Sequence, residues 1–360
     1  MLYYLLYPLR DVWHVFNVFK YSTFRSIYAA LTAILICFII GPYVIKKLKT
    51  LHFGQSIRTD GPKSHHVKSG TPTMGGIIII FAIVISTLLW AKLDNRLVLL
   101  ALTSLVWFGS VGAIDDLLKI TKKNALGLSM RTKVIGQLIG AFGIGMYLYV
   151  NPQVVEFATH IKIPLVKYPV NFAYLYVPFI MLVIIGASNA VNLTDGLDGL
   201  AIGTFIFTAM SFVIVTYIVG HSKFSEYLRI IHVSEASELV VFCASMVGAS
   251  LGFLWFNAYP AQVFMGDTGA LALGGALGTV AVLIKQELLL ILIGGIFVIE
   301  ALSVILQILS FKLYGKRIFL MAPLHHHFEL SGWAEPKIVV RFWIITIICT
   351  LLSLSLLKLR

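Results

Sequence analysis

Long apolar runs alternate with short polar segments along almost the whole chain. A bilayer core about 30 Å thick is crossed by a helix of roughly 20 apolar residues, and ten runs approach that length. The predicted spans are 24–45, 74–91, 97–114, 134–150, 173–190, 200–219, 237–256, 269–284, 288–311 and 338–357. The pattern therefore predicts an all-α polytopic membrane protein with ten transmembrane helices.

The first residues differ from the spans that follow. Residues 1–22 carry Arg10, Asp11 and Lys20 among many aromatic side chains, and they lack the charged, apolar and small-residue regions of a signal peptide. We interpret them as an interfacial N-terminal segment. Because no linker interrupts the chain, we expect one integral membrane domain over residues 1–360.

The composition supports a membrane protein and excludes other classes. Hydrophobic residues make up 59% of the chain and charged residues 12%, whereas about 25% of a typical soluble domain is charged. A disordered chain and an ordinary soluble globule are excluded. The three cysteines all lie in apolar runs, which argues against a disulfide framework or a zinc site.

Charge sets the expected orientation. Ten spans place both termini on one side, and Lys and Arg are densest in the loops after odd-numbered spans, at 46–68 and 119–133. The positive-inside rule puts these loops in the cytoplasm and both termini in the periplasm. The rule also explains the net charge of +12 without a nucleic-acid partner, and we expect none. Basic loops also suit polyanionic substrates.

The unusual polar clusters all follow odd-numbered spans. They are the stretch 63–76, Asp115 and Asp116, the segment 192–199, the segment 257–267, and His325, His326 and His327. Because these loops share one face of the membrane, their convergence predicts an active site on the cytoplasmic face.

The aspartates each allow two interpretations. Asp115 and Asp116 are expected to close the third span, where Lys119 is spaced to pair with Asp115; by themselves they indicate an interfacial acid pair. Asp195 and Asp198 would share a face on a helix start, or complement the helix dipole there. Asp267 is an isolated carboxylate in a glycine turn, suited to Mg²⁺ and equally to capping the eighth span.

The three histidines do not fit a single metal ion. In a helix their rings would point about 100° apart, and in a strand the middle ring would face away. We expect contacts to a phosphate or a base, with an exposed loop as the alternative. Glu300 and Gln307 lie within the ninth span. We interpret Glu300 as a buried hydrogen-bond partner for another helix, away from the loop cluster.

Together these motifs resemble a known family. Thr71-Pro-Thr73-Met-Gly-Gly76, Asp115-Asp116, the segment 189–199, Phe264-Met-Gly-Asp267 and the segment 321–329 are similar, in order and spacing, to the MraY family of phospho-N-acetylmuramoyl-pentapeptide-transferases. The aspartates alone mark the wider superfamily of polyprenyl-phosphate N-acetylhexosamine-1-phosphate transferases. The triple-histidine loop and the Thr-Pro-Thr-Met-Gly-Gly stretch narrow the resemblance to MraY.

The resemblance implies a reaction at the bacterial inner membrane. Phospho-MurNAc-pentapeptide passes from UDP-MurNAc-pentapeptide to undecaprenyl phosphate in the lipid bilayer, with Mg²⁺ as cofactor, giving lipid I and UMP. It implies catalytic roles for Asp115, Asp116, Asp267 and His326, with Asp267 as the metal ligand. It implies substrate binding by Lys68, Thr73, Asn192, Asp195, Asp198, Phe264, Gln307, His325 and His327. A homodimer is compatible with the sequence, which does not fix the oligomeric state.

Alternatives remain for mechanism and for function. The lipid phosphate could attack directly, with Asp115 as base, or an aspartate could act as covalent nucleophile; we favour direct attack because positioning and Mg²⁺ supply most of what phosphoryl transfer needs. The alternative function is a related UDP-GlcNAc transferase, against which the triple-histidine loop argues. A transporter would place its acidic residues near the middle of the membrane, whereas here they cluster at one end of the spans.

Overall fold

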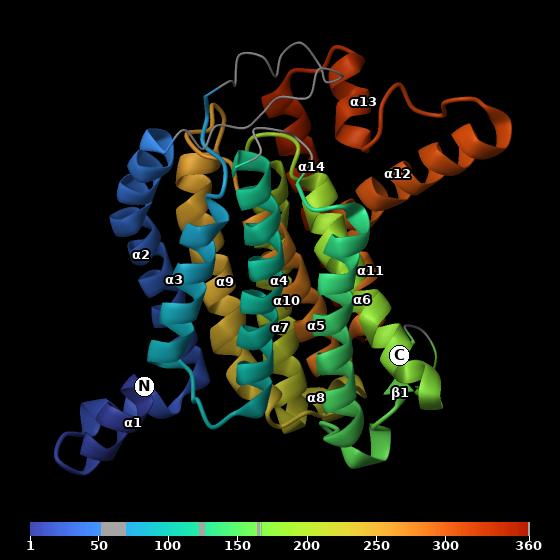
Figure 1. Ribbon diagram of the computed structural model, residues 1–360. Coiled ribbons are helices and arrows are strands. Elements are labelled where there is room, and N and C mark those ends of the chain that lie inside the picture. Colours follow the sequence, from blue (N-terminus) through green and yellow to red (C-terminus); the bar gives the residue numbers. More distant parts are fainter. Residues whose placement is uncertain (52–69, 122–126, 164–165, 167, 359–360) are drawn as a thin grey trace.

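A bundle of long antiparallel helices forms the body of the protein (Figure 1). The computed structural model describes residues 1–51, 70–121, 127–163, 166 and 168–358. The long helices are α2 (Ser22–Thr50), α3 (Gly76–Trp90), α4 (Arg96–Thr121), α5 (Met130–Val150), α6 (Tyr176–Thr194), α7 (Leu200–Gly220), α9 (Ala236–Asn257), α10 (Gly266–Leu283), α12 (Gly295–Tyr314) and α14 (Glu335–Leu356).

Shorter elements connect or flank these helices. They are α1 (Leu2–Leu6), η1 (Tyr7–Asp11), η2 (His14–Lys20), η4 (Val155–Phe157), β1 (His160–Ile161), β2 (Val170–Asn171), η5 (Ala173–Leu175), α8 (Ser222–Leu228), α11 (Glu287–Ile293) and α13 (Leu324–Leu330). The two strands pair antiparallel, with His160 opposite Asn171.

A polytopic membrane protein is confirmed, and the count of ten spans stays a prediction. Among the described residues, nine helices are long and apolar enough to cross a membrane. The remaining predicted span corresponds to α3, which is apolar but has 15 residues, about 22 Å of helix. That length is short for a bilayer core of about 30 Å.

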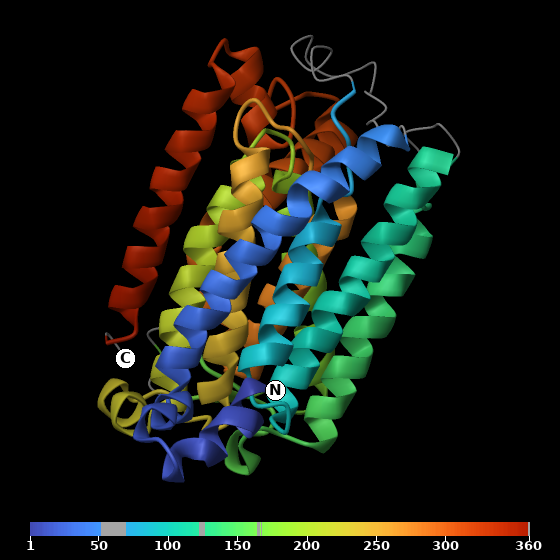
Figure 2. The same ribbon diagram turned by 90° about the vertical axis from the view of Figure 1, so that its left-hand side faces the viewer.

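The two ends of the bundle carry different features. Both termini lie toward one end (Figure 2), which we call the terminal end; it holds the first residues of α2 and α9 and the last residues of α14. We call the opposite end, where α4, α6 and α9 finish and α10 begins, the motif end. The predicted aspartate and histidine motifs all belong to the motif end, as counting of spans predicts.

The centre of the bundle is formed by α9 and α10. In the most apolar 18-residue stretch of each helix, 78% of the residues of α9 and 89% of those of α10 are buried, against 22% for both α2 and α12. Small residues allow this close packing, because they let helix backbones approach. A side chain at Gly274 would collide with the backbone of α6 at Ala187 and Ser188. Because α10 is the most buried of these helices and begins at the motif end, its first turn lies in the middle of that end.

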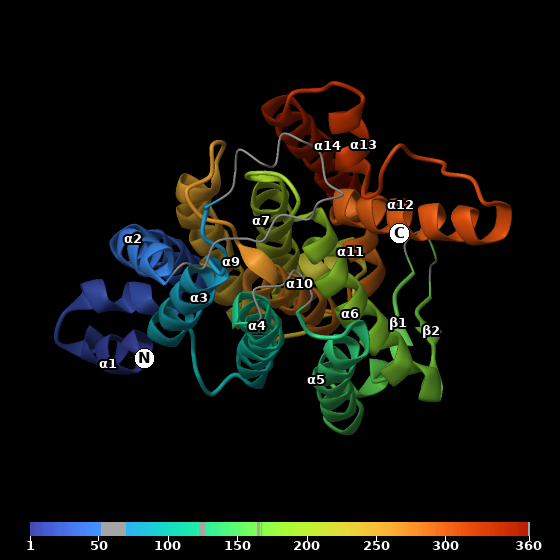
Figure 3. The same ribbon diagram turned by 45° about the horizontal axis from the view of Figure 1, so that its top comes forward.

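The ninth predicted span is wrong as a single helix. The run 288–311 forms α11 and α12, separated at Gly294, whose backbone leaves the helical conformation. Figures 1 and 3 show α12 leaning outward from the bundle. Glycine is a poor helix former, so the pair Gly294-Gly295 permits the break, but the unbroken hydrophobicity of the run does not reveal the change in direction.

The short elements α1, η1 and η2 lie beside the terminal end, as expected for a segment outside the bundle (Figure 1). The hydroxyl of Tyr4 donates to Asp94, at 2.6 Å, and thereby connects this segment to the α3–α4 turn. Val12 and Trp13 are exposed, which suits contact with a membrane interface.

Candidate active site

Three aspartates from two helices meet at the motif end. Asp115 and Asp116 lie on α4 and Asp267 lies in the first turn of α10; one carboxylate oxygen from each falls within 4.8 Å of the others. Asp115 and Asp116 are buried. They do not close a helix, as the sequence predicted, because α4 continues to Thr121. We call these three residues the aspartate cluster.

Two lysines neutralise part of this charge. The Lys119 ammonium lies 2.7 Å from Asp115 Oδ2 and 2.6 Å from Asp267 Oδ2. Lys133, from the first turn of α5, lies 2.7 Å from the same Asp267 oxygen. The predicted pairing of Lys119 with Asp115 is confirmed; because α4 continues past both residues, they lie four apart on one helix face.

Asp116 holds the start of α10. Its carboxylate accepts hydrogen bonds from the Thr268 backbone N–H at 2.9 Å and the Thr268 hydroxyl at 2.7 Å. The first N–H groups of a helix lack partners within the helix, and Asp116 supplies one from α4. Asp267 makes no such cap, so its capping interpretation is wrong and its carboxylate faces the lysines instead.

The Thr-Pro-Thr-Met-Gly-Gly stretch packs against the segment that precedes Asp267. Gly75 N–H donates to the Phe264 carbonyl, and Phe264 N–H to the Pro72 carbonyl, both at 2.8 Å. Gly266 has φ +72°, and a side chain there would lie 2.7 Å from Asp116 Oδ2. The glycine thus permits both the turn and the approach to the cluster. Thr73 and Phe264 are half-buried beside it; Lys68 lies outside the described residues.

The segment between α6 and α7 reaches the same place. Asn192 is still within α6, and its amide donates to Asp267 Oδ1 at 2.7 Å. Asp195 and Asp198 follow the end of α6, in the turn before α7, so they do not share a helix face as predicted. Asp198 is buried and accepts from Ala261 N–H at 3.0 Å, which fixes the turn.

The surroundings of Asp195 disfavour its ionised form. Burial, together with the carboxylates of Asp267, Asp116 and Asp198, raises the pKa of Asp195 to about 8. Burial and like charges both disfavour the ionised form of a carboxyl group. Without an added cation, this environment therefore favours the neutral form of Asp195.

The three histidines face three different partners from one turn of α13. Nδ1 of His325 lies 3.2 Å from Glu300, Nδ1 of His326 lies 2.8 Å from Glu329, and Nδ1 of His327 accepts from Leu320 N–H at 3.2 Å. The prediction that they do not share one metal ion is supported by this arrangement. His325 is fully buried against Gly196, and its Nε2 has no partner among the described residues.

Glu300 and Gln307 both hold the histidine region in place from α12. Glu300 is fully buried and also accepts from the His325 N–H at 3.2 Å. Its interpretation as a buried hydrogen-bond partner is confirmed, but its placement away from the loop cluster is wrong. Gln307 exchanges hydrogen bonds with the backbone of Ile318 and Phe319, each at 3.0 Å, so its amide supports the loop before α13.

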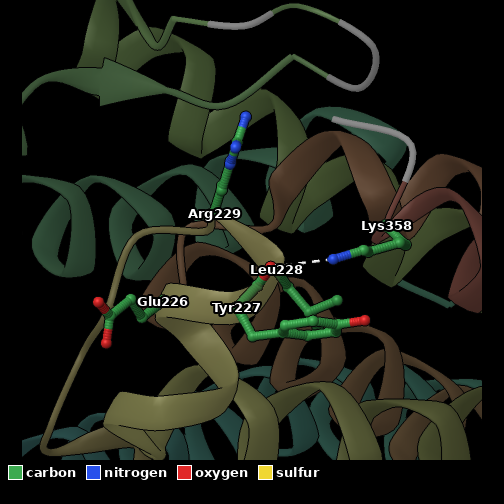
Figure 4. A pocket seen from close by; sticks show the side chains of 5 residues that line it. All are labelled: Glu226, Tyr227, Leu228, Arg229 and Lys358. Atoms are coloured by element: carbon green, nitrogen blue, oxygen red, sulfur yellow. Dashed lines mark hydrogen bonds between the residues drawn. The ribbon is translucent and has the colours of Figure 1, made fainter.

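A surface cavity lies elsewhere, at the terminal end. It is lined by Glu226, Tyr227, Leu228, Arg229 and Lys358, and the Lys358 ammonium donates to the Tyr227 carbonyl (Figure 4). None of the predicted site residues borders it. The chemistry indicated by the sequence thus belongs to the crowded motif end and not to this cavity.

Comparisons with known proteins identify a family whose signature includes residues at the motif end. The model for glycosyl transferase family 4 matches residues 97–285, and signature 1 of phospho-N-acetylmuramoyl-pentapeptide-transferase matches residues 68–80. Proteins of that name from Citrifermentans bemidjiense and from Geobacter sp. are each 57% identical to this chain, and one from Pelobacter propionicus is 55% identical; each match covers both chains completely. The chain belongs to the phospho-N-acetylmuramoyl-pentapeptide-transferase family. The signature ends within α3, directly after the stretch that packs on Phe264.

Sequence reasoning did not assign several residues of this family member to the site. Lys133 and Thr268 contact the aspartate cluster, and Glu335 accepts from the Asp198 N–H at 2.8 Å. Each of the three contacts a residue that is distant in the chain, so linear spacing gives no signal for them. Lys133 could have been suspected from its position in the basic segment 119–133.

Proposed function

We propose that this chain transfers phospho-MurNAc-pentapeptide from UDP-MurNAc-pentapeptide to undecaprenyl phosphate, giving lipid I and UMP. An oxygen of the lipid phosphate forms a bond to the sugar-bearing phosphorus, and the bond from that phosphorus to the UMP oxygen breaks. The observation that carries the proposal is the meeting of the aspartate cluster, the signature stretch and the histidine motif at one end of a membrane bundle, in a chain 57% identical over its whole length to named transferases.

The aspartate cluster fits a divalent cation, and we propose Mg²⁺ with Asp267 as a ligand. Mg²⁺ prefers oxygen donors and takes one or two carboxylates together with substrate phosphates and water. The cluster offers such oxygens, and an ammonium group already lies among them. When bound, the cation would neutralise the diphosphate and the leaving UMP.

The hydrogen bonds of the aspartates support direct attack by the lipid phosphate. Asp116 accepts from both groups of Thr268, and Asp115 accepts from Leu128 N–H at 2.6 Å and pairs with Lys119. A carboxylate engaged in this way is a poor nucleophile. The phosphate monoester has a second pKa of about 6, so at neutral pH it needs little help from a base.

The remaining site residues divide between two roles. We propose that Asn192, Asp195, Thr73, Phe264 and Lys68 contact the nucleotide and its phosphates, because the described members of this set border the aspartate cluster. His326 and His327 would contact the donor from α13. Asp198, Gln307 and His325 would act by holding the loops, since hydrogen bonds to other parts of the chain already engage them.

The proposed setting is the bacterial inner membrane, with the motif end in the cytoplasm and both termini in the periplasm. The donor is water-soluble and the acceptor is a lipid, so the site must lie where water meets the bilayer. A cysteine replacing Lys312, exposed at the end of α12, should resist a membrane-impermeant thiol reagent in intact cells. A cysteine replacing the exposed Glu156 should react; the reverse pattern would invert the topology.

The reaction is tested with both sugar donors. The purified protein in detergent, given Mg²⁺ and undecaprenyl phosphate, should release UMP and form a lipid-linked product from UDP-MurNAc-pentapeptide but hardly from UDP-GlcNAc. Excess EDTA should stop the reaction. Robust turnover of UDP-GlcNAc would instead support the related GlcNAc-1-phosphate transferase, and turnover in EDTA would refute the cation site.

A further inference from the structure

One ammonium group touches all three carboxylates of the aspartate cluster. Lys119 Nζ lies 2.6 Å from Asp267 Oδ2, 2.7 Å from Asp115 Oδ2 and 3.6 Å from Asp116 Oδ1. A cation shared by the three carboxylates would have to lie in the same place. Lys133 contacts Asp267 and Asp115 at 2.7 and 3.6 Å, and no ion pair joins it to Asp116.

The charges in the cluster are not balanced. In the described part of the chain, three carboxylates meet the two ammonium groups of Lys119 and Lys133. Both lysines also crowd the same Asp267 oxygen, where their positive charges repel one another. The two lysines therefore hold the three carboxylates together but do not neutralise all of their negative charge.

Lys119 is the more exposed of the two lysines. Its side chain is 31% exposed, whereas that of Lys133 is 18% exposed. A lysine carries its charge on a flexible four-carbon stem, and it binds phosphate as a point charge. If the ammonium group left the cluster, its side chain would keep it nearby, within reach of a phosphate that approaches the carboxylates.

We propose that Lys119 is a tethered counter-ion, which occupies the shared cation position in the metal-free protein and withdraws when a divalent cation binds. Its freed ammonium then pairs with a phosphate group of the substrates. The inference rests on the proposed divalent-cation site and assigns Lys119 a positioning role that couples this site to the anionic ligands. By linkage, an occupied cation site and bound phosphate favour one another.

Amine labelling reports this exchange directly. An ammonium held among carboxylates offers little free amine, so reductive methylation of Lys119 in the full-length protein should be slow in EDTA and severalfold faster in Mg²⁺, as measured by mass spectrometry. The exposed Lys312 serves as internal control and should not change. Equal or slower labelling of Lys119 in Mg²⁺ would overturn the proposal.

Metal affinity gives a second, independent measurement. Lys119→Met removes the competing ammonium and should tighten Mn²⁺ binding on the order of tenfold, whereas Lys312→Met should leave it unchanged. Lys119→Met should also weaken the binding of UMP in the presence of Mn²⁺. Unchanged or weaker Mn²⁺ binding by Lys119→Met would count against the exchange.

The two proposals fail in different ways. If the wild-type protein binds no Mn²⁺, or binds it equally well after Asp267→Asn, the cation site itself is refuted. If wild-type protein binds Mn²⁺ through Asp267 while Lys119 labelling stays constant, the cation site stands and the counter-ion role of Lys119 is refuted. Lys119→Met protein that is unstable in EDTA but recovers in Mn²⁺ supports the exchange, because the ion then replaces the missing charge.

Discussion

Buried charges occur at both ends of the bundle, and they are arranged in opposite ways. At the terminal end, Arg25 of α2 holds Glu238 of α9 with two hydrogen bonds of 2.6 Å, and Lys92 lies 3.7 Å from the same carboxylate. One carboxylate thus meets two cations. At the motif end, three carboxylates share two lysines.

This difference distinguishes a structural ion pair at the terminal end from a cluster suited to binding a further cation at the motif end. A bidentate arginine–carboxylate pair is geometrically complete, and removing one partner leaves a buried charge without compensation. A cluster short of positive charge instead has affinity left for another cation. We therefore expect the ion pair at the terminal end to stay fixed and the counter-ions at the motif end to exchange.

The largest expected effect is at the motif end. Asp267→Asn should lower turnover of UDP-MurNAc-pentapeptide by at least about a thousandfold, since stabilisation of several kcal/mol by the bound cation would be lost. The variant should remain folded in detergent, with a thermal unfolding midpoint in EDTA close to that of the wild type. Activity within tenfold of the wild type would remove Asp267 from the catalytic set.

The opposite result is expected at the terminal end. Arg25→Met should lower the free energy of unfolding by about 3 kcal/mol, because the buried Glu238 would lose its bidentate partner and keep only the more distant Lys92. The double variant Arg25→Met/Glu238→Leu should recover most of this stability. Mn²⁺ affinity should be the same in all folded forms. A stability loss that the double variant does not relieve would show that the pair itself is not the cause.

The histidine motif offers an intermediate case, with the fully buried Glu300 carboxylate paired with one histidine, His325. Glu300→Ala should reduce turnover roughly tenfold to hundredfold, because His325 and the loop that presents His326 would lose their position. Glu300→Gln keeps an oxygen that can accept from the His325 N–H, so it should retain more activity. If Gln and Ala variants lose activity equally while both stay folded, the charge of Glu300 matters more than its hydrogen bonds.

The smallest effect concerns pH. A pKa of about 8 for Asp195 lies above the ordinary value of about 3.9 in an unfolded chain, so the folded protein binds the extra proton. Stability in EDTA should therefore fall as pH rises from about 4 to 8. Between pH 6 and 8.5, Asp195→Asn should show a shallower decline of the unfolding midpoint than the wild type. Identical slopes would mean that Asp195 does not carry this proton.

The sequence predicted the periodic part of the molecule well. Apolar length located every long helix except the broken pair α11 and α12, where Gly294 changes direction without interrupting hydrophobicity. Parity placed the aspartate and histidine motifs at one end, which the described helices confirm. Helix geometry also predicted that the three histidine rings point in different directions, and Nδ1 of each ring meets a different partner.

Contacts between helices were beyond such reasoning. Lys133 joins Asp267 across 134 positions in the chain, and Glu300 joins His325 across 25, so no local pattern reveals either pair. The misplacement of Glu300 followed from treating depth in a span as distance from the loops. Because α12 leans outward and α13 folds back, a residue one and a half turns into α12 reaches the histidine motif.

The most direct test of the exchangeable cluster is an anomalous difference map from crystals of the full-length protein soaked in Mn²⁺. We predict one peak among Asp115, Asp116 and Asp267, with Lys119 Nζ moved away from all three carboxylates. The Arg25–Glu238 pair should be unchanged in the same crystals. Absence of a peak at the cluster at saturating Mn²⁺, or a peak there with Lys119 still in contact with all three carboxylates, would contradict the account.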